Sequence, residues 1–186
     1  APVYEYFDSS LPQRERDVEK AKSLLKEAGK EGLEITLYAP DLQEIPQLAE
    51  LIQTQLKDIG MKITLGIEPT STFYDRWCKV YDSTNEPAGC DGGAEFGIVD
   101  YGNRGTPDVY LVKAYSTGEW NSAHYVSADF NAAVKEYQAS LDLDGRKAAI
   151  TKVEKIANAD IPYVIPYFYN SLTAYKKNVT GIRATG

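Results

Sequence analysis

Residues 33–67 carry the pattern that most restricts how this chain can fold. The segments "LEITLY" and "MKITLGI" each alternate apolar and polar residues, which is typical of a strand with one buried face. Between them, apolar residues recur at helical spacing from Ile45 to Ile59, and Gly60 can end the helix. Two strands joined by a helix of about four turns are parallel and are connected by a right-handed crossover. The sequence therefore predicts a βαβ unit within an α/β fold.

Other elements are expected on both sides of this unit. Asp17 can cap a first helix that Gly29 closes. The apolar segment 95–101, "EFGIVDY", predicts a short buried strand that brings Asp100 to the carboxyl edge of the sheet, where open α/β sheets bind ligands. The remaining expected elements are a short helix capped by Thr70 or Ser71 that carries Phe73, Trp77 and Val80, a helix opened by Pro107, helices from about Asp129 to Leu141 and from about Gly145 to Asn158, and a strand over 160–169.

Composition limits the function classes open to this chain. A length of 186 residues suits a single domain, and we expect one over 1–186 whose core needs neither metal nor disulfide. The 27 acidic residues outnumber the 20 basic ones, and Lys and Arg form no stripe, so nucleic acid is not an expected partner. No apolar run approaches the roughly 20 residues that cross a bilayer, and the N-terminal segment lacks a signal-peptide pattern.

Catalytic signatures are missing from the sequence. It contains no Gly-x-Ser-x-Gly elbow, no phosphate loop, no His-Glu-x-x-His and no glycine-rich dinucleotide fingerprint. The single histidine, His124, has no spacing to a cysteine that indicates a nucleophile pair. Two thiols and one distant histidine also lack the ligand spacing of a structural zinc site. We therefore expect no enzyme activity, no metal and no cofactor.

Three longer segments, taken in order, resemble one known family. They are "VEKAKSLLKEAGKEGLEITLYAP", "IPQLAELIQTQLKDIGMKITL" and "SADFNAAVKEYQASLDLDGRKAAITKVEKIANADIPYVIPYFY", the last with Phe130, Arg146, Asp160 and Pro162 at matching positions. Their order and spacing resemble the C-terminal lobe of the family 5 extracytoplasmic solute-binding proteins of ATP-binding-cassette (ABC) importers, the dipeptide, oligopeptide and nickel-binding group. The resemblance implies an α/β, class II periplasmic-binding-protein-like lobe with a central mixed sheet flanked by helices, excised from a longer two-lobed protein.

The resemblance also implies a function and a location. An oligopeptide or related small solute would lie between this lobe and a larger N-terminal lobe of the same protein, and hinge closure would exclude water. The ligand would then pass to the membrane permease subunits of an ABC importer, on the periplasmic or extracellular side of the membrane. A sensory or protein-interaction domain that uses the same fold is an alternative, and a secreted hydrolase is a weaker one.

The prediction for the two cysteines depends on whether the protein is exported. In an exported protein, Cys78 and Cys90 favour a local disulfide across a turn-rich segment. Closing so short a loop contributes about 3 kcal/mol by restricting the unfolded chain. The alternative is that both are unpaired small hydrophobic residues.

The resemblance places the ligand site after the predicted strand at 95–101. Family members read Asp-Tyr-Pro-Asp-Pro there, whereas Asp100 and Tyr101 are followed by the insertion "GNRGTPD". In peptide binders the first aspartate of this motif faces the ligand's α-amino group, so Asp100 is the candidate to pair with a cation through a charge-assisted hydrogen bond. Asp100 can equally be a structural acid that holds its own loop.

Side chains that follow Asp100 complete the candidate site. Arg104 can clamp a ligand carboxylate or be solvated, and Trp120 can stack on a ligand or pack within its loop. His124 can donate a hydrogen bond, although a lone histidine is more often structural. The predicted ligand-binding residues are Asp100, Tyr101, Arg104, Trp120, Asn121 and His124.

Overall fold

The predicted βαβ unit is present in the computed structural model, which describes residues 5–76, 96–102, 104–116, 120–169 and 174–182. Strand β1 (Glu34–Pro40) and strand β2 (Lys62–Glu68) are parallel and pair in register from Glu34 with Lys62 to Pro40 with Glu68. Helix α2 (Ile45–Lys57) packs on both strands. The shared core of this unit is formed by Leu37, Ala39, Ile45, Ala49 and Ile63.

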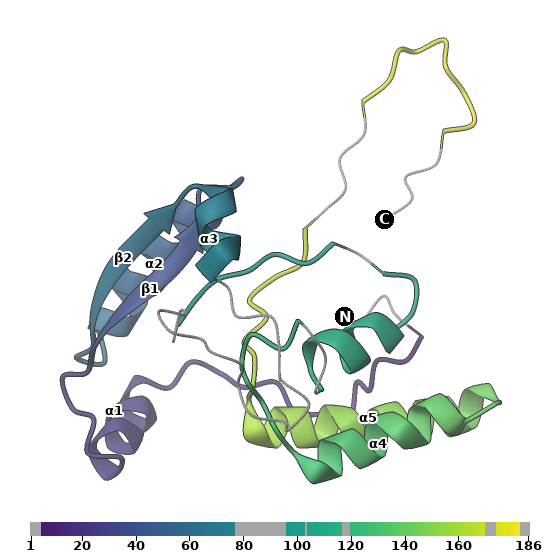
Figure 1. The fold of residues 1–186 in the computed structure, drawn as a ribbon, viewed down its shortest axis with the longest axis horizontal. Helices are drawn as coiled ribbons and strands as arrows, with labels where there is room; N and C mark the ends of the chain where they lie inside the picture. The colour runs from purple at the N-terminus through teal and green to yellow at the C-terminus, as the bar shows by residue number, and fades with distance from the viewer. Residues whose placement is uncertain (1–4, 77–95, 103, 117–119, 170–173, 183–186) are drawn as a thin grey trace.

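The ends of the first helices follow the predicted capping chemistry. Helix α1 (Val18–Glu27) begins after Asp17, whose carboxylate accepts a hydrogen bond from the Lys20 backbone nitrogen at 2.9 Å. Gly29 and Gly60 follow α1 and α2 with positive φ angles of 65° and 86°, which glycine adopts without strain. No residue of α1 is fully buried, so it is a surface helix beside the sheet unit (Figure 1).

The predicted strand at 95–101 is wrong in extent. Gly97 makes an isolated parallel bridge to Tyr38, in which the Tyr38 nitrogen donates to the Phe96 oxygen at 3.0 Å and the Ile98 nitrogen donates to the Tyr38 oxygen at 2.9 Å. The next bond of this ladder would need an N–H from Pro40, and proline has none. The described residues therefore contain a two-stranded parallel sheet with one added bridge, and the expected mixed sheet is not found among them.

A second packing unit holds the C-terminal helices (Figure 1). Helix α4 (Ala128–Ala139) and helix α5 (Leu143–Asp160) pack on each other and on Leu111, within the π-helix η1 (Tyr110–Ala114) that follows Pro107. The core of this unit consists of Leu111, Phe130, Ala133, Val134, Tyr137, Ala149, Ile150 and Val153. The sequence predicted both long helices to within two residues, and the short helix α3 (Thr70–Arg76) packs on β1.

The predicted strand at 160–169 is also wrong. Residues 161–169 pair with no described strand, and Val164 and Phe168 keep 81% and 59% of their surface exposed. Pro162 and Pro166 lack the N–H that a ladder requires, and neither described strand lies beside this segment to pair with it. Residues 174–182 are exposed and project away from both packing units (Figure 1).

Candidate functional site

Asp100 lies just beyond the sheet, at the carboxyl end of β1, as the sequence predicted. The bridge at Gly97 runs parallel to β1, so residues 98–100 continue past the end of that strand. The Asp100 carboxylate is half-buried, and its Oδ1 accepts a hydrogen bond of 2.8 Å from the hydroxyl of Tyr74 on α3. Burial and then the hydrogen bond to Asp100 raise the pKa of Tyr74, so this hydroxyl remains a donor at neutral pH.

Tyr101 joins the segment after the bridge to the loop at Trp120. Its hydroxyl donates to the backbone oxygen of Trp120 at 3.2 Å, and burial raises the pKa of Tyr101. The ring of Tyr101 meets the edge of Tyr110 at a centroid distance of 5.4 Å, and Tyr110 stacks on Tyr115 at 6.1 Å. These amphipathic rings form an aromatic wall that follows Asp100 in the chain.

Trp120 is half-buried and is held on both its backbone and its ring. Its nitrogen donates to the Lys113 oxygen at 2.8 Å, and the Lys113 ammonium lies 5.1 Å from the centroid of the indole ring. That geometry is a cation–π contact. One face of the indole is therefore already in contact with the chain.

Asn121 is 2% exposed and holds the turn that follows Trp120. Its Nδ2 donates to the Tyr125 oxygen at 2.9 Å, and its Oδ1 accepts from the Tyr125 nitrogen at 3.2 Å and from the Tyr163 hydroxyl at 2.9 Å. The half-buried His124 sits in the same turn with a φ of 51°, and its nitrogen donates to the Asn121 oxygen at 3.0 Å. In this structure the Asn121 amide shapes the loop.

Arg104 is exposed in the insertion that separates Tyr101 from Pro107. Its Nη1 donates to the Gly102 oxygen at 3.1 Å, and the Tyr110 hydroxyl donates to the same oxygen. The insertion is therefore folded back on itself next to the aromatic wall.

The structure thus links all six predicted residues, Asp100 and Arg104 only indirectly. Tyr101, Trp120, Asn121 and His124 are linked directly, and Asp100 precedes Tyr101 in the chain. Arg104 reaches this group through Gly102 and Tyr110. Sequence reasoning missed Tyr74, which lies 26 positions before Asp100 and has no motif around it. The predicted disulfide of Cys78 with Cys90 lies outside the described residues.

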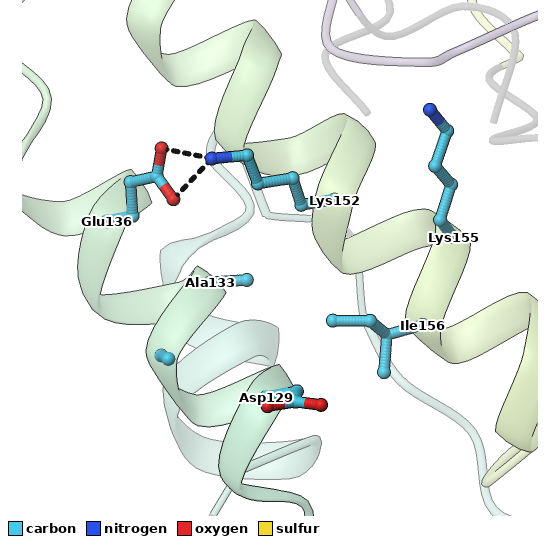
Figure 2. A pocket seen from close by; sticks show the side chains of 7 residues that line it. Asp129, Ala133, Glu136, Lys152, Lys155 and Ile156 are labelled. Carbon is cyan, nitrogen blue, oxygen red and sulfur yellow. Dashed lines mark hydrogen bonds and ion pairs between the residues drawn. The ribbon is translucent and has the colours of Figure 1, made fainter.

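A shallow groove lies elsewhere, between α4 and α5 (Figure 2). It is lined by Asp129, Ala132, Ala133, Glu136, Lys152, Lys155 and Ile156. The Lys152 ammonium donates to both carboxylate oxygens of Glu136, at 2.6 and 2.7 Å, across the mouth of the groove. Exposed ion pairs of this kind contribute little free energy. The groove is the shallow space where the surfaces of α4 and α5 meet.

Two kinds of feature are missing from the described part of the chain. No group of three His, Cys, Asp or Glu side chains there is arranged to hold a metal ion. Within the same residues, no helix combines the length and the apolar composition needed to cross a membrane.

The fold is that of periplasmic binding proteins. One solved structure similar to this chain is the ABC transporter-associated periplasmic binding protein DppA from Helicobacter pylori in complex with the peptide STSA, with a TM-score of 0.73, 23% identity, and coverage of 88% of this chain and 31% of that one. Another is NikA from Staphylococcus aureus in complex with Ni(L-His)2, with a TM-score of 0.69, 18% identity, and coverage of 85% and 32%. At such identities the likeness establishes the fold alone.

The sequence model of the family "Bacterial extracellular solute-binding proteins, family 5 Middle" matches residues 1–134. The chain therefore belongs to this family. This is a family of solute-binding proteins and not of enzymes. Among curated relatives, Di/tripeptide-binding protein 4 from Pseudomonas aeruginosa is 25% identical over 184 residues, which cover 92% of this chain and 32% of the relative. The chain spans about a third of the length of the curated relatives it matches.

Proposed function

We propose that this chain is one wall of a peptide-binding cleft in an extracytoplasmic receptor of an ABC importer. Family membership supports the receptor role, and both the relative from Pseudomonas aeruginosa and the complex from Helicobacter pylori are named for peptides. The observation that carries the proposal is the Asp100 carboxylate, half-buried beyond the carboxyl end of β1 and fixed by Tyr74. Ligands of open α/β folds bind outside the carboxyl ends of the strands, so the acid lies where such a ligand would be found.

Each predicted residue has a part in this proposal. Asp100 pairs with the α-ammonium group of the peptide, and Arg104 pairs with a negative group. Trp120 offers a ring face, and Tyr101 fixes the Trp120 backbone against the aromatic wall. Asn121 and His124 supply hydrogen bonds from the turn after Trp120, and a ligand that uses the Asn121 amide displaces one of its present partners.

The rest of a longer protein supplies the other half of the binding cleft. In this proposal residues 1–186 form a single C-terminal lobe of class II type, and segments beyond it complete a mixed sheet and the opposite wall of the cleft. Hinge closure of the two lobes buries the peptide, and the closed receptor docks on permease subunits at the periplasmic or extracellular face of the membrane.

Native mass spectrometry of the full-length protein, purified from its own host, tests this function. We expect a co-purifying peptide that is lost in Asp100→Ala. A retained nickel chelate would instead indicate a ligand like the Ni(L-His)2 bound by NikA from Staphylococcus aureus, whose fold is similar. A protein that arrives empty, and whose melting temperature shifts with no peptide, sugar or metal in a broad panel, would favour a sensory or interaction domain.

A further inference from the structure

We propose that Tyr74 is a positioning residue that fixes one oxygen of the Asp100 carboxylate and leaves the other to the ammonium group of the ligand. This role rests on the proposed function. It adds to the site a residue from α3, a helix that precedes the candidate residues in the chain.

The Tyr74 hydroxyl and the Asp100 carboxylate are brought together by two elements that both attach to β1. Helix α3 packs on β1, and its Phe73 is 2% exposed, with a backbone nitrogen that donates to the Pro69 oxygen at 3.0 Å. Asp100 is attached to the same strand through the bridge at Gly97. The 2.8 Å bond therefore joins two anchored segments, so the carboxylate is oriented before a ligand arrives.

The Asp100 carboxylate has a second oxygen to offer. An ionised carboxylate can accept hydrogen bonds on both of its oxygens. Tyr74 occupies Oδ1, and within the part of the chain that the structure describes Oδ2 accepts no hydrogen bond. Fixing Oδ1 limits rotation of the carboxylate about its last bond, which sets the direction in which Oδ2 presents its lone pairs.

The charge of Asp100 is also uncompensated among the described residues. No described lysine or arginine forms an ion pair with it. Its negative charge instead acts on tyrosines, since Asp100 is one of the groups, after burial, that raise the pKa values of Tyr74, Tyr101 and Tyr169. A half-buried anion with neutral hydroxyl neighbours gains most from a cation brought by a ligand.

The matched control for this inference is a second tyrosine–aspartate bond in the chain. The Tyr137 hydroxyl donates to Asp108 Oδ2 at 3.1 Å, and Tyr137 belongs to the core between α4 and α5. Tyr137→Phe removes the same type of bond from a carboxylate that is not one of the predicted ligand-binding residues. It reports what the loss of a tyrosine–carboxylate bond does to stability alone.

The test uses the full-length protein and isothermal titration calorimetry with trialanine and Ser-Thr-Ser-Ala, each with a free amine and as the N-acetylated peptide. We expect Tyr74→Phe to weaken binding of the free-amine peptides about tenfold. Binding of the N-acetylated peptides, which carry no ammonium group, should change little, and Tyr137→Phe should change neither. In an Asp100→Asn background, Tyr74→Phe should cause no further loss, because the two residues act through one carboxylate.

The outcomes separate this role from the function on which it rests. Equal loss for free-amine and N-acetylated peptides in Tyr74→Phe, or unchanged affinity for both, would overturn the role of Tyr74 while the receptor function stands. Unchanged affinity in Asp100→Asn with a lowered melting temperature would make Asp100 a structural acid and would also overturn it. A wild-type protein that binds none of the four probes would count against peptide binding itself, and the role of Tyr74 would fall with it.

Discussion

Tyr38 lies opposite Gly66 in the β1–β2 register, and a Cβ atom on Gly66 would fall 2.7 Å from Cδ1 of the Tyr38 ring. On the other edge of β1, the Tyr38 backbone makes both hydrogen bonds that hold residues 96–98. The side chain of this tyrosine thus lies over one neighbouring strand while its backbone binds the segment that leads to Asp100. The absence of a side chain at Gly66 is what makes room for that ring.

We expect Gly66→Ala to destabilise the protein by about 1–3 kcal/mol, the usual cost of forcing an extra methyl group into a packed site. The added carbon would also lie 3.2 Å from Cγ2 of Thr36, so a second side chain would have to shift as well. Urea denaturation measures the change in the free energy of unfolding. Gly105→Ala is the control, because a Cβ at Gly105 has no neighbour within 4 Å. Equal stability of the two variants would contradict the close contact.

Trp120→Ala should weaken peptide binding roughly tenfold, because an aromatic contact contributes on the order of 1 kcal/mol beyond its buried area. Trp120→Phe should keep most of the affinity, since a ring remains at the same position. Calorimetry on the full-length protein checks both variants. If Trp120→Ala binds peptide as the wild type does but melts at a lower temperature, the indole serves the contact with Lys113 and not the ligand.

The half-buried Glu154 predicts a pH dependence of stability. Burial raises the pKa of Glu154 above its ordinary value of 4.5, although its Oε2 accepts a hydrogen bond of 3.1 Å from the Asp8 nitrogen. A carboxyl group whose pKa is raised on folding binds more protons in the native state, so its contribution to stability grows as pH falls toward 4.5 and is lost as pH rises through the folded pKa.

The measurement is the difference in unfolding free energy between wild type and Glu154→Gln over this pH range. At neutral pH we expect the glutamine variant to be at least as stable as the wild type, and the difference should move in favour of the wild type on acidification. Asp8 acts in the opposite direction, since hydrogen bonds from Ser10 lower the pKa of Asp8. Asp8 is therefore kept in both the wild type and the Glu154→Gln variant. Glu50 is exposed, so Glu50→Gln is the control for the loss of one negative charge. A wild-type advantage that grows with rising pH would refute this assignment.

The pairing of Cys78 with Cys90 stays a prediction, and it can be tested without structural information. If the bridge forms in the exported protein, thiol alkylation under denaturing conditions should label neither cysteine until a reductant is added. Reduction should then cost about 3 kcal/mol of stability, the entropy of closing a short loop. Labelling of both cysteines without a reductant would mean that they are unpaired.

The sequence was sufficient to predict those elements whose signal is local. Strands β1 and β2, helix α2 and the caps at Asp17 and Gly29 depend on periodicity and on residues next to each end, and all are present. The same holds for α4 and α5. A strand was also predicted at 160–169, but a strand needs a neighbour to bond with, and no local pattern reports whether one is there.

The candidate site depended on contacts between distant segments. Position in the chain was enough to place Asp100 at the carboxyl edge of the sheet, because this acid ends a short apolar segment. Tyr74 could not be found in this way, since its role depends on α3 and residues 96–100 meeting the same strand. The burial of Asn121 was equally hidden, because its partner Tyr163 lies 42 positions later.

Pro40 gives the sheet a chemical end point. Because its ring nitrogen carries no hydrogen, the next hydrogen bond after the bridge at Gly97, from position 40 to the Ile98 oxygen, cannot form. A residue with an amide hydrogen at position 40 would restore the donor for that bond. A missing donor atom in one strand thus interrupts the regular hydrogen bonding between β1 and the segment that leads to Asp100.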